Sequence, residues 1–172
     1  PTYLIGHRIW MINIYNSTLN SIFKTSTCPY TIWPHREAVI KSCSYRPCTS
    51  FCECGIYSFK DDIEKDVLRN FFLMYSCFIL AVGSVRQWGK IIIHERGYRS
   101  EFAYPDSIKI FICNRCGSYI EKVKEGVLID VDVPINLVIC RKCIRSKDKF
   151  SSSKFENLCY KLSNFYDIEV LD

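Results

Sequence analysis

Four cysteines in the second half of the chain have the residue type and spacing of metal ligands. They form two Cys-x-x-Cys pairs, Cys113 with Cys116 and Cys140 with Cys143. A two-residue spacer lets both thiolates of a pair face one ion, and two pairs supply the four thiolates of a structural zinc site. Because such a site is closed, we expect the zinc to stabilise the fold and not to catalyse a reaction.

The residues around the two pairs indicate a zinc ribbon. Gly117 directly follows the first pair, where it allows the positive φ angle that closes such a turn. The segment between the pairs is long enough for two strands, which we expect at about residues 118–139. The alternative is four free thiols with this spacing by chance, and the doubled spacing argues against it.

A second cysteine cluster lies in a proline-rich stretch of the first half. Its members are Cys43, Cys48, Cys52 and Cys54. In an extended strand Cys52 and Cys54 point to the same face, and a loop could bring the other two to them. The cluster could therefore bind a second zinc ion, with His35 as a spare ligand, or consist of small buried core residues. The other three cysteines, expected to be core thiols, are Cys28, Cys77 and Cys159.

Basic residues crowd the second cysteine pair. The segment holds Arg141, Lys142, Arg145, Lys147 and Lys149, against a single acid, Asp148. These side chains could contact the phosphates of DNA or RNA, or they could form a solvated face. The net charge of +5 allows contact with nucleic acid but does not require it. Aromatic residues make up 15% of the chain, and we expect them to fill the core before they serve any stacking surface.

A third group of polar residues falls in the central segment 83–105. Its members His94, Glu95, Arg99 and Glu101 could converge near one hairpin. Arg99 would offer a planar fork to a carboxylate or phosphate, and His94 could act as a base oriented by a glutamate. The alternative is a hairpin tip held by a salt bridge, with Trp88 and Tyr104 packed beneath it. The chain has no motif for a nucleophile, a phosphate loop or a catalytic metal.

Two sequence blocks resemble a family of uncharacterised bacterial proteins. One block is Cys52-Glu53-Cys54-Gly55-Ile56-Tyr57, and the other holds Trp88-Gly89, His94-Glu95, Gly97-Tyr98-Arg99, Glu101 and Ala103-Tyr104-Pro105. The resemblance covers roughly residues 6–105 and implies kinship without a particular activity. The family pattern has a His between the positions of Cys43 and Cys52. This chain has Cys48 there, which favours a metal site.

The pattern of apolar residues predicts an α+β fold. We expect an antiparallel, barrel-like β-rich core over residues 1–108, a zinc ribbon over 109–149, and a C-terminal helix over 150–172 that packs on the core. Ile63, Val67 and Phe71 recur at helical spacing, which predicts a helix at 62–75 inserted in the core and capped by Asp61 or Asp62.

The remaining elements follow from shorter patterns. Residues 77–82 indicate a buried strand, and 83–93 with 98–104 indicate a hairpin that turns at 94–97 and ends at Pro105. Ser153 and Glu156 have capping-box spacing for the last helix, after a short serine linker at 151–153. The apolar stripe of that helix is Phe155, Leu158, Leu162 and Phe165.

Three functions fit these patterns. The first is a non-enzymatic binding module that contacts DNA, RNA or a nucleotide through basic and aromatic residues, including Trp88, Tyr104, Arg141, Lys142 and Arg145. The second is an adaptor that binds another protein and has a purely structural zinc. The third is an enzyme that uses the polar residues of the central segment. An odd number of cysteines, 11, argues against a closed set of disulfides, and the N-terminal residues lack a signal-peptide pattern. We therefore expect a cytoplasmic protein that does not span a membrane.

Overall fold

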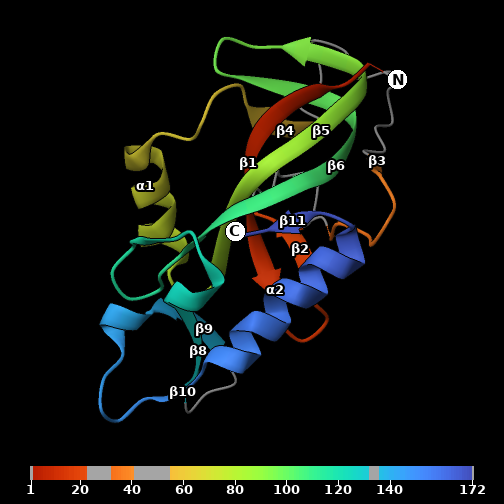
Figure 1. Cartoon of the computed structure of the whole chain (residues 1–172). Helices are drawn as coiled ribbons and strands as arrows, with labels where there is room; N and C mark the ends of the chain where they lie inside the picture. The colour runs from red at the N-terminus through yellow and green to blue at the C-terminus, as the bar shows by residue number, and fades with distance from the viewer. Residues whose placement is uncertain (1, 23–31, 41–54, 132–135, 172) are drawn as a thin grey trace.

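The computed structural model describes residues 2–22, 32–40, 55–131 and 136–171, which form two sheets and two helices (Figure 1). The larger sheet contains β1 (Leu4–Asn13), β2 (Thr18–Ser21), β3 (Val39–Ile40), β4 (Ile56–Phe59), β5 (Ile79–Ile93), β6 (Gly97–Ile112), β7 (Tyr119–Ile120) and β11 (Glu169–Val170). The smaller sheet contains β8 (Gly126–Asp130), β9 (Asn136–Cys140) and β10 (Lys149–Ser151). The helices are α1 (Lys65–Tyr75) and α2 (Ser152–Tyr166). The described residues thus have the α+β character expected, with mostly antiparallel sheets.

Three long strands form the centre of the larger sheet. Strand β5 lies between β1 and β6 and is antiparallel to both. Strand β2 extends the sheet beyond β1, and β4 pairs with β6 near the β5–β6 hairpin. Strand β11 runs parallel to β6, with Glu169 opposite Ser107 and Val170 opposite Ile108.

The side chains of the central strands alternate between two hydrophobic cores. On β1, Ile9 and Met11 belong to the core that contains Phe71 of α1, whereas Trp10 belongs to the core that contains Phe155 of α2. This alternation follows from the period of two along a strand. Figure 1 shows the consequence, because the two helices lie on different sides of β1, β5 and β6.

The larger sheet does not close into a true barrel, so the barrel-like part of the expectation is wrong. Strand β4 pairs with β6 from Ile56 to Phe59, but it meets β1 through one residue pair, His7 with Phe59. A barrel needs pairing along the full contact between all neighbouring strands. The sheet therefore stays open where β4 ends.

Helix α1 begins at Lys65 and not at residue 62, although it ends at Tyr75 as predicted. Neither aspartate caps it: Glu64 precedes the helix without a side-chain cap hydrogen bond, and Asp62 Oδ1 lies 3.2 Å from His7 Nδ1. The strand expected from residue 77 begins later, at Ile79, because a turn follows the helix. In that turn the Phe78 amide donates to the Tyr75 carbonyl at 2.9 Å.

The predicted hairpin is present, but Pro105 does not end its second strand, which continues to Ile112. The register shifts beside this proline, so that Val85 pairs with Pro105 and Ser84 with Ser107, which leaves Asp106 as an extra residue. Proline is tolerated at such a bulge because the ladder there does not need its missing amide hydrogen. Residues 77–82 and 83–93 also do not form separate strands, since β5 runs through Gly83 without a break.

Helix α2 has a different start from the predicted one. Ser151 is the N-cap, and its Oγ accepts a hydrogen bond from the Lys154 amide at 3.1 Å, so the capping box of Ser153 and Glu156 is wrong. Residues 151–153 are not a linker, because they end β10 and begin the helix. Three residues of the predicted stripe, Phe155, Leu158 and Leu162, are buried. Phe165 is 37% exposed, and Tyr166 is buried in its place.

The core beneath α2 contains residues from all three expected parts of the chain, 1–108, 109–149 and 150–172. These include Trp10 from the first part, Ile139 from the second and Leu158 from the third. Strand β6 also crosses the expected boundary at residue 108. In the part of the chain that the structure describes, no helix has the length and apolar character needed to span a membrane.

Candidate metal centre

The four predicted ligands meet where two strands end. Cys113 directly follows β6, and Cys140 is the last residue of β9. The four Sγ atoms all lie within 4.8 Å of one another, and those of Cys116 and Cys140 are 3.8 Å apart. A tetrahedral ion with metal–sulfur distances of about 2.3 Å keeps its sulfurs about 3.8 Å apart. The donor set therefore fits one metal ion.

Main-chain hydrogen bonds shape the first turn. Gly117 has a φ of 72°, as predicted for the residue after the pair, and its amide donates to the Cys113 carbonyl at 2.9 Å. The Cys113 amide donates to the Ser118 carbonyl at 2.9 Å. Across the site, the Cys140 amide donates to Cys113 Sγ at 3.3 Å, which stabilises negative charge on that sulfur.

Asn114 fixes the first turn to its surroundings. Its side-chain Nδ2 donates to the carbonyls of Ser76 and Phe78, at 2.8 and 2.6 Å, after the end of α1. Its Oδ1 accepts from the Val138 amide at 2.9 Å, and its own amide donates to the Val138 carbonyl at 2.8 Å. One residue of the first Cys-x-x-Cys pair therefore binds both the turn after α1 and β9, which brings the second pair to the first.

Arg115 joins the first pair to the second. Its Nη2 donates to Asp148 Oδ1 at 2.7 Å, and its Nη1 contacts Asp148 Oδ2 and donates to the Cys143 carbonyl at 2.6 Å. The Arg145 amide also donates to Asp148 Oδ2, at 2.6 Å. The Asp148 side chain is only 7% exposed, so this fork-to-fork pair is largely shielded from solvent.

These contacts shift the pKa values of the groups in opposite directions. The hydrogen bonds from Arg115, and then that from the Arg145 amide, hold the pKa of Asp148 well below its usual range. Burial and the neighbouring thiols raise the pKa of Cys143, and burial raises the pKa of Cys113. Burial opposes ionisation of Cys116 too, but hydrogen bonds from Ser118 prevail and lower its pKa to about 6. Four crowded thiols cannot all ionise without a cation between them, which is the role that a divalent ion would fill.

The basic segment beside the second pair is exposed to solvent. Its five basic residues Arg141, Lys142, Arg145, Lys147 and Lys149 are all exposed. Arg141 has structural partners as well, since its Nε donates to the Lys124 carbonyl and its Nη2 donates to Ser152 Oγ at 3.0 Å. The single acid of the segment, Asp148, turns inward to Arg115.

Among the polar residues of the central segment, Arg99 and His94 both lie beside Tyr57, and Glu95 and Glu101 have other surroundings. Arg99 is buried, and its guanidinium lies 5.9 Å from the ring centre of Tyr57 on the paired strand. Glu101 accepts from the Lys90 amide at 3.4 Å, opposite the bulge at Gly89, whose φ is 77°. Glu95 is exposed in the turn, and His94 stacks on Tyr57 with 6.5 Å between ring centres.

Two aromatic residues expected beneath the hairpin tip have other roles. Trp88 stacks on Phe102, with ring centres 6.0 Å apart, along the β5–β6 pair. Tyr104 lies farther along β6 and donates its hydroxyl to the Tyr166 carbonyl, at the end of α2, at 2.6 Å.

The second cysteine cluster, Cys43 to Cys54, lies outside the described residues, and so does Cys28. His35 is described, and its ring packs against Phe165 and Tyr166, with centres 4.6 and 5.0 Å away. Cys159 is a buried thiol, as predicted, and burial raises its pKa to about 12. Cys77 is exposed, because it lies in the turn before β5, so its assignment to the core is wrong.

Comparison with family models, with curated proteins and with solved structures gave no match for this chain. The kinship suggested by the two sequence blocks therefore stays a prediction.

Three residues that matter to the metal centre were missed from the sequence. Asn114 and Arg115 occupy the spacer of the first Cys-x-x-Cys pair, and the spacing rule says nothing about the side chains there. Asp148 was counted only as one opposing charge. The signal that could have pointed to Asp148 is its place as the single acid of a basic run, since a carboxylate can form a strong bidentate pair with an arginine elsewhere in the chain.

Proposed function

We propose that the protein is a zinc-stabilised binding module that contacts DNA or RNA through exposed basic residues beside its second cysteine pair. Zinc is the proposed ion because four thiolates in a closed set are the usual donors of structural zinc. The β8–β9 strand pair between the two cysteine turns supports a zinc ribbon. A reducing, cytoplasmic compartment would keep the thiols available to the metal.

The nucleic-acid part of the proposal rests on the position of Asp148, the single acid of the basic segment. The carboxylate that would offset the basic run is bound by Arg115 and is 7% exposed. Lys142, Arg145 and Lys147 keep exposed side chains, so their charges face solvent. Of these three, Arg145 also interacts with Asp148, through its amide and its charge. Exposed lysines and arginines on one short segment suit phosphate contacts, which supply sequence-independent affinity.

The test is a salt titration with short fluorescein-labelled DNA and RNA, each single-stranded and duplex. In the variant, Lys142, Arg145 and Lys147 are changed to Gln. We expect weaker binding to every probe and a salt slope that is smaller by about 2 to 3, because each lost phosphate contact lowers the slope by about 0.7 to 0.9. Arg141 is left unchanged, since its hydrogen bonds to Lys124 and Ser152 give it a structural role.

The matched control changes three exposed basic residues elsewhere, Lys65, Lys109 and Lys161, to Gln. This control has the same net charge as the variant but an intact basic segment. Equal loss of affinity in both proteins would show a general charge effect, and the proposed surface would be wrong. Zinc content is measured in each protein, so that loss of the metal is not mistaken for loss of a phosphate contact.

An adaptor that binds another protein is the second candidate, and exposed apolar residues near the end of α1 favour it. Leu73 is 66% exposed, Met74 is 64% exposed and Phe78 is 47% exposed. Neighbouring apolar side chains in contact with water often mark a protein-binding surface. Failure of the zinc-loaded wild type to bind any of the nucleic-acid probes would favour this function over the first.

A further inference from the structure

We propose that the cleft between β1, β4 and the β5–β6 hairpin binds a small molecule that joins a planar aromatic ring to an anionic group, with Arg8 and Arg96 as its cationic contacts. The cleft has a volume of about 460 Å³. That volume falls within the range of small-molecule sites, about 300 to 1,000 Å³. Its position is the open end of the sheet, where the pairing of β4 with β1 is limited to His7 and Phe59.

Aromatic rings give the cleft its shape. Tyr57 and Phe59 come from β4, and His94 and Tyr98 come from the two ends of the hairpin turn. Tyr57 and His94 are stacked with an angle of 21° between their rings, so they present parallel flat faces. Flat apolar walls of this kind favour a planar ring, which gains contact area and stacking.

Arg8, which lines the cleft, is a buried arginine. Its side chain is buried, donates to the Tyr57 carbonyl and donates to Ser21 Oγ at 2.9 Å. Its Nε has no hydrogen-bond partner, and none of the ion pairs between described residues gives it a carboxylate. Burial lowers the pKa of Arg8 to about 10, so the group is still a cation at neutral pH.

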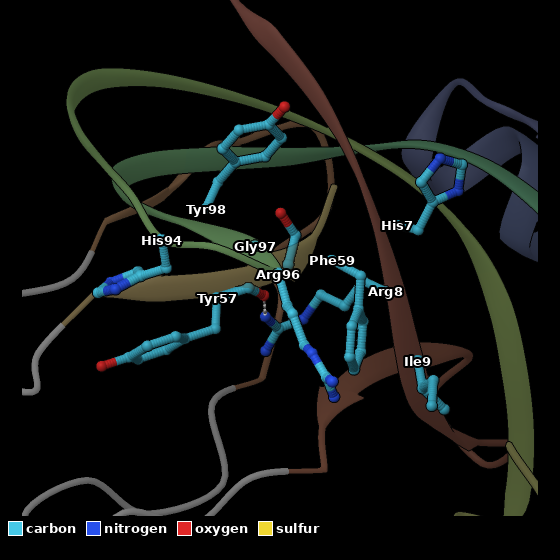
Figure 2. Close-up of a pocket in the computed structure, with 10 residues that line it drawn as sticks. His7, Arg8, Ile9, Tyr57, Phe59, His94, Arg96, Gly97 and Tyr98 are labelled. Atoms are coloured by element: carbon cyan, nitrogen blue, oxygen red, sulfur yellow. Dashed lines mark hydrogen bonds between the residues drawn. The ribbon is translucent and has the colours of Figure 1, made fainter. Parts of the chain in front are cut away.

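A buried cation that has no carboxylate partner among the described residues carries an electrostatic cost that an anion nearby would offset. The ring of Trp33, whose centre is 5.2 Å from the Arg8 guanidinium, offsets part of it but supplies no negative charge. Arg96 adds a second, exposed guanidinium from the hairpin turn. Figure 2 shows Arg8, Tyr57 and Arg96 pointing to the same side of β4.

The charged side chains that line the cleft are Arg8 and Arg96, and the exposed acid Glu95 neighbours Arg96 in the hairpin turn. Lys60 Nζ lies 5.9 Å from the ring centre of Tyr98, and the Lys60 amide donates to the Arg96 carbonyl at 3.2 Å. The acid that pairs at this edge is Asp62, whose exposed carboxylate contacts His7. An anionic group fits the guanidinium groups, and an aromatic body fits the rings between them.

The experiment compares 2-naphthoate with 2-naphthamide, which have the same ring but differ in charge. Binding is measured by calorimetry and by amide shifts in NMR spectra of the full chain. The variant is Arg96→Gln, chosen because Arg96 is exposed, whereas Arg8 holds Tyr57 and Ser21 and its loss would disturb the fold. The control is Arg69→Gln, which removes an exposed arginine from α1.

We expect wild type to bind naphthoate at least about tenfold more tightly than naphthamide, with shifts at His94 to Tyr98. Arg96→Gln should weaken naphthoate binding about tenfold and leave naphthamide binding unchanged, while Arg69→Gln should change neither. Equal affinity for the two probes, no binding of either, or an Arg96→Gln protein with unchanged naphthoate affinity would each overturn the proposal.

Discussion

Arg115 and Asp148 connect the two cysteine pairs through a bidentate contact, in which Arg115 Nη2 lies 2.7 Å from Asp148 Oδ1. Arg115 lies between the candidate ligands Cys113 and Cys116, and Asp148 follows the candidate ligand Cys143. The same guanidinium donates to the Cys143 carbonyl, so one side chain from the first pair orients the second. Groups that orient ligands in this way affect metal affinity without touching the ion.

The first prediction tests that orientation. Arg115→Met removes both contacts, and we expect the affinity for zinc to fall by about 10- to 100-fold, as is usual for partners of metal ligands. Competition with a chromophoric chelator measures the change. The control is Lys154→Gln, which removes a more exposed ion pair with Asp130 next to the same small sheet. Zinc affinity that is unchanged in Arg115→Met would show that the pair does not support the site.

The second prediction concerns the metal itself. Elemental analysis of protein washed with a weak chelator should find bound zinc, and Cys140→Ser should lower the content by one ion per chain, because the site has no spare donor among the described residues. Cys77→Ser is the control, since Cys77 is an exposed thiol outside the site. Two ions in wild type would show that the Cys43 to Cys54 cluster binds metal too. A wild-type protein without zinc would contradict the proposed centre.

The third prediction concerns Tyr166, a buried tyrosine that links α2 to the start of the chain. Its hydroxyl donates to the Trp33 carbonyl at 2.7 Å and accepts from the Leu19 amide at 2.9 Å. Tyr166→Phe leaves both main-chain groups without this partner, so we expect the free energy of unfolding to fall by about 1 to 3 kcal/mol at neutral pH. Urea denaturation measures the change, and Tyr160→Phe, at an exposed position on the same helix, should have little effect.

Tyr166 also predicts a loss of stability in alkali. Burial raises its pKa to about 12, above the ordinary value of 10.0, so the folded protein keeps this proton longer than the unfolded chain does. The contribution of Tyr166 is therefore complete below pH 10 and is lost as the pH rises through about 12. The stability difference between wild type and Tyr166→Phe should shrink over that interval, and a difference that stays constant would be contrary to this assignment.

Local spacing was enough to predict that the four cysteines Cys113, Cys116, Cys140 and Cys143 come together. The two Cys-x-x-Cys pairs specify their turns with few residues, and Gly117 has the positive φ that such a turn needs. The helix of residues 65–75 and the β5–β6 hairpin were also found, because their apolar periods and their glycines are local signals. The predicted ends of these elements were less accurate where contacts with residues distant in the sequence determine where the element begins or ends.

Contacts between distant residues explain the errors. Asp62 lies beside His7 and not at the start of α1, and no pattern within residues 61–75 shows this. Pro105 lies within β6 because the bulge at Asp106 forms against β5, and a bulge depends on the register of two strands. Arg115 and Asp148 are far apart in the chain, so their pairing needed the folded structure.

The pairing order of the larger sheet has a consequence for synthesis on the ribosome. Strand β1 is translated early, but its main partner β5 begins only at Ile79, and β6 gains β11 only when residues 169 and 170 have been made. Before β5 is made, the strands available to β1 are β2 and the single pair that it forms with β4, so most of its length on the β5 side is an unpaired edge. We therefore expect nascent chains that end before β5 to need a chaperone, since unpaired strand edges promote aggregation.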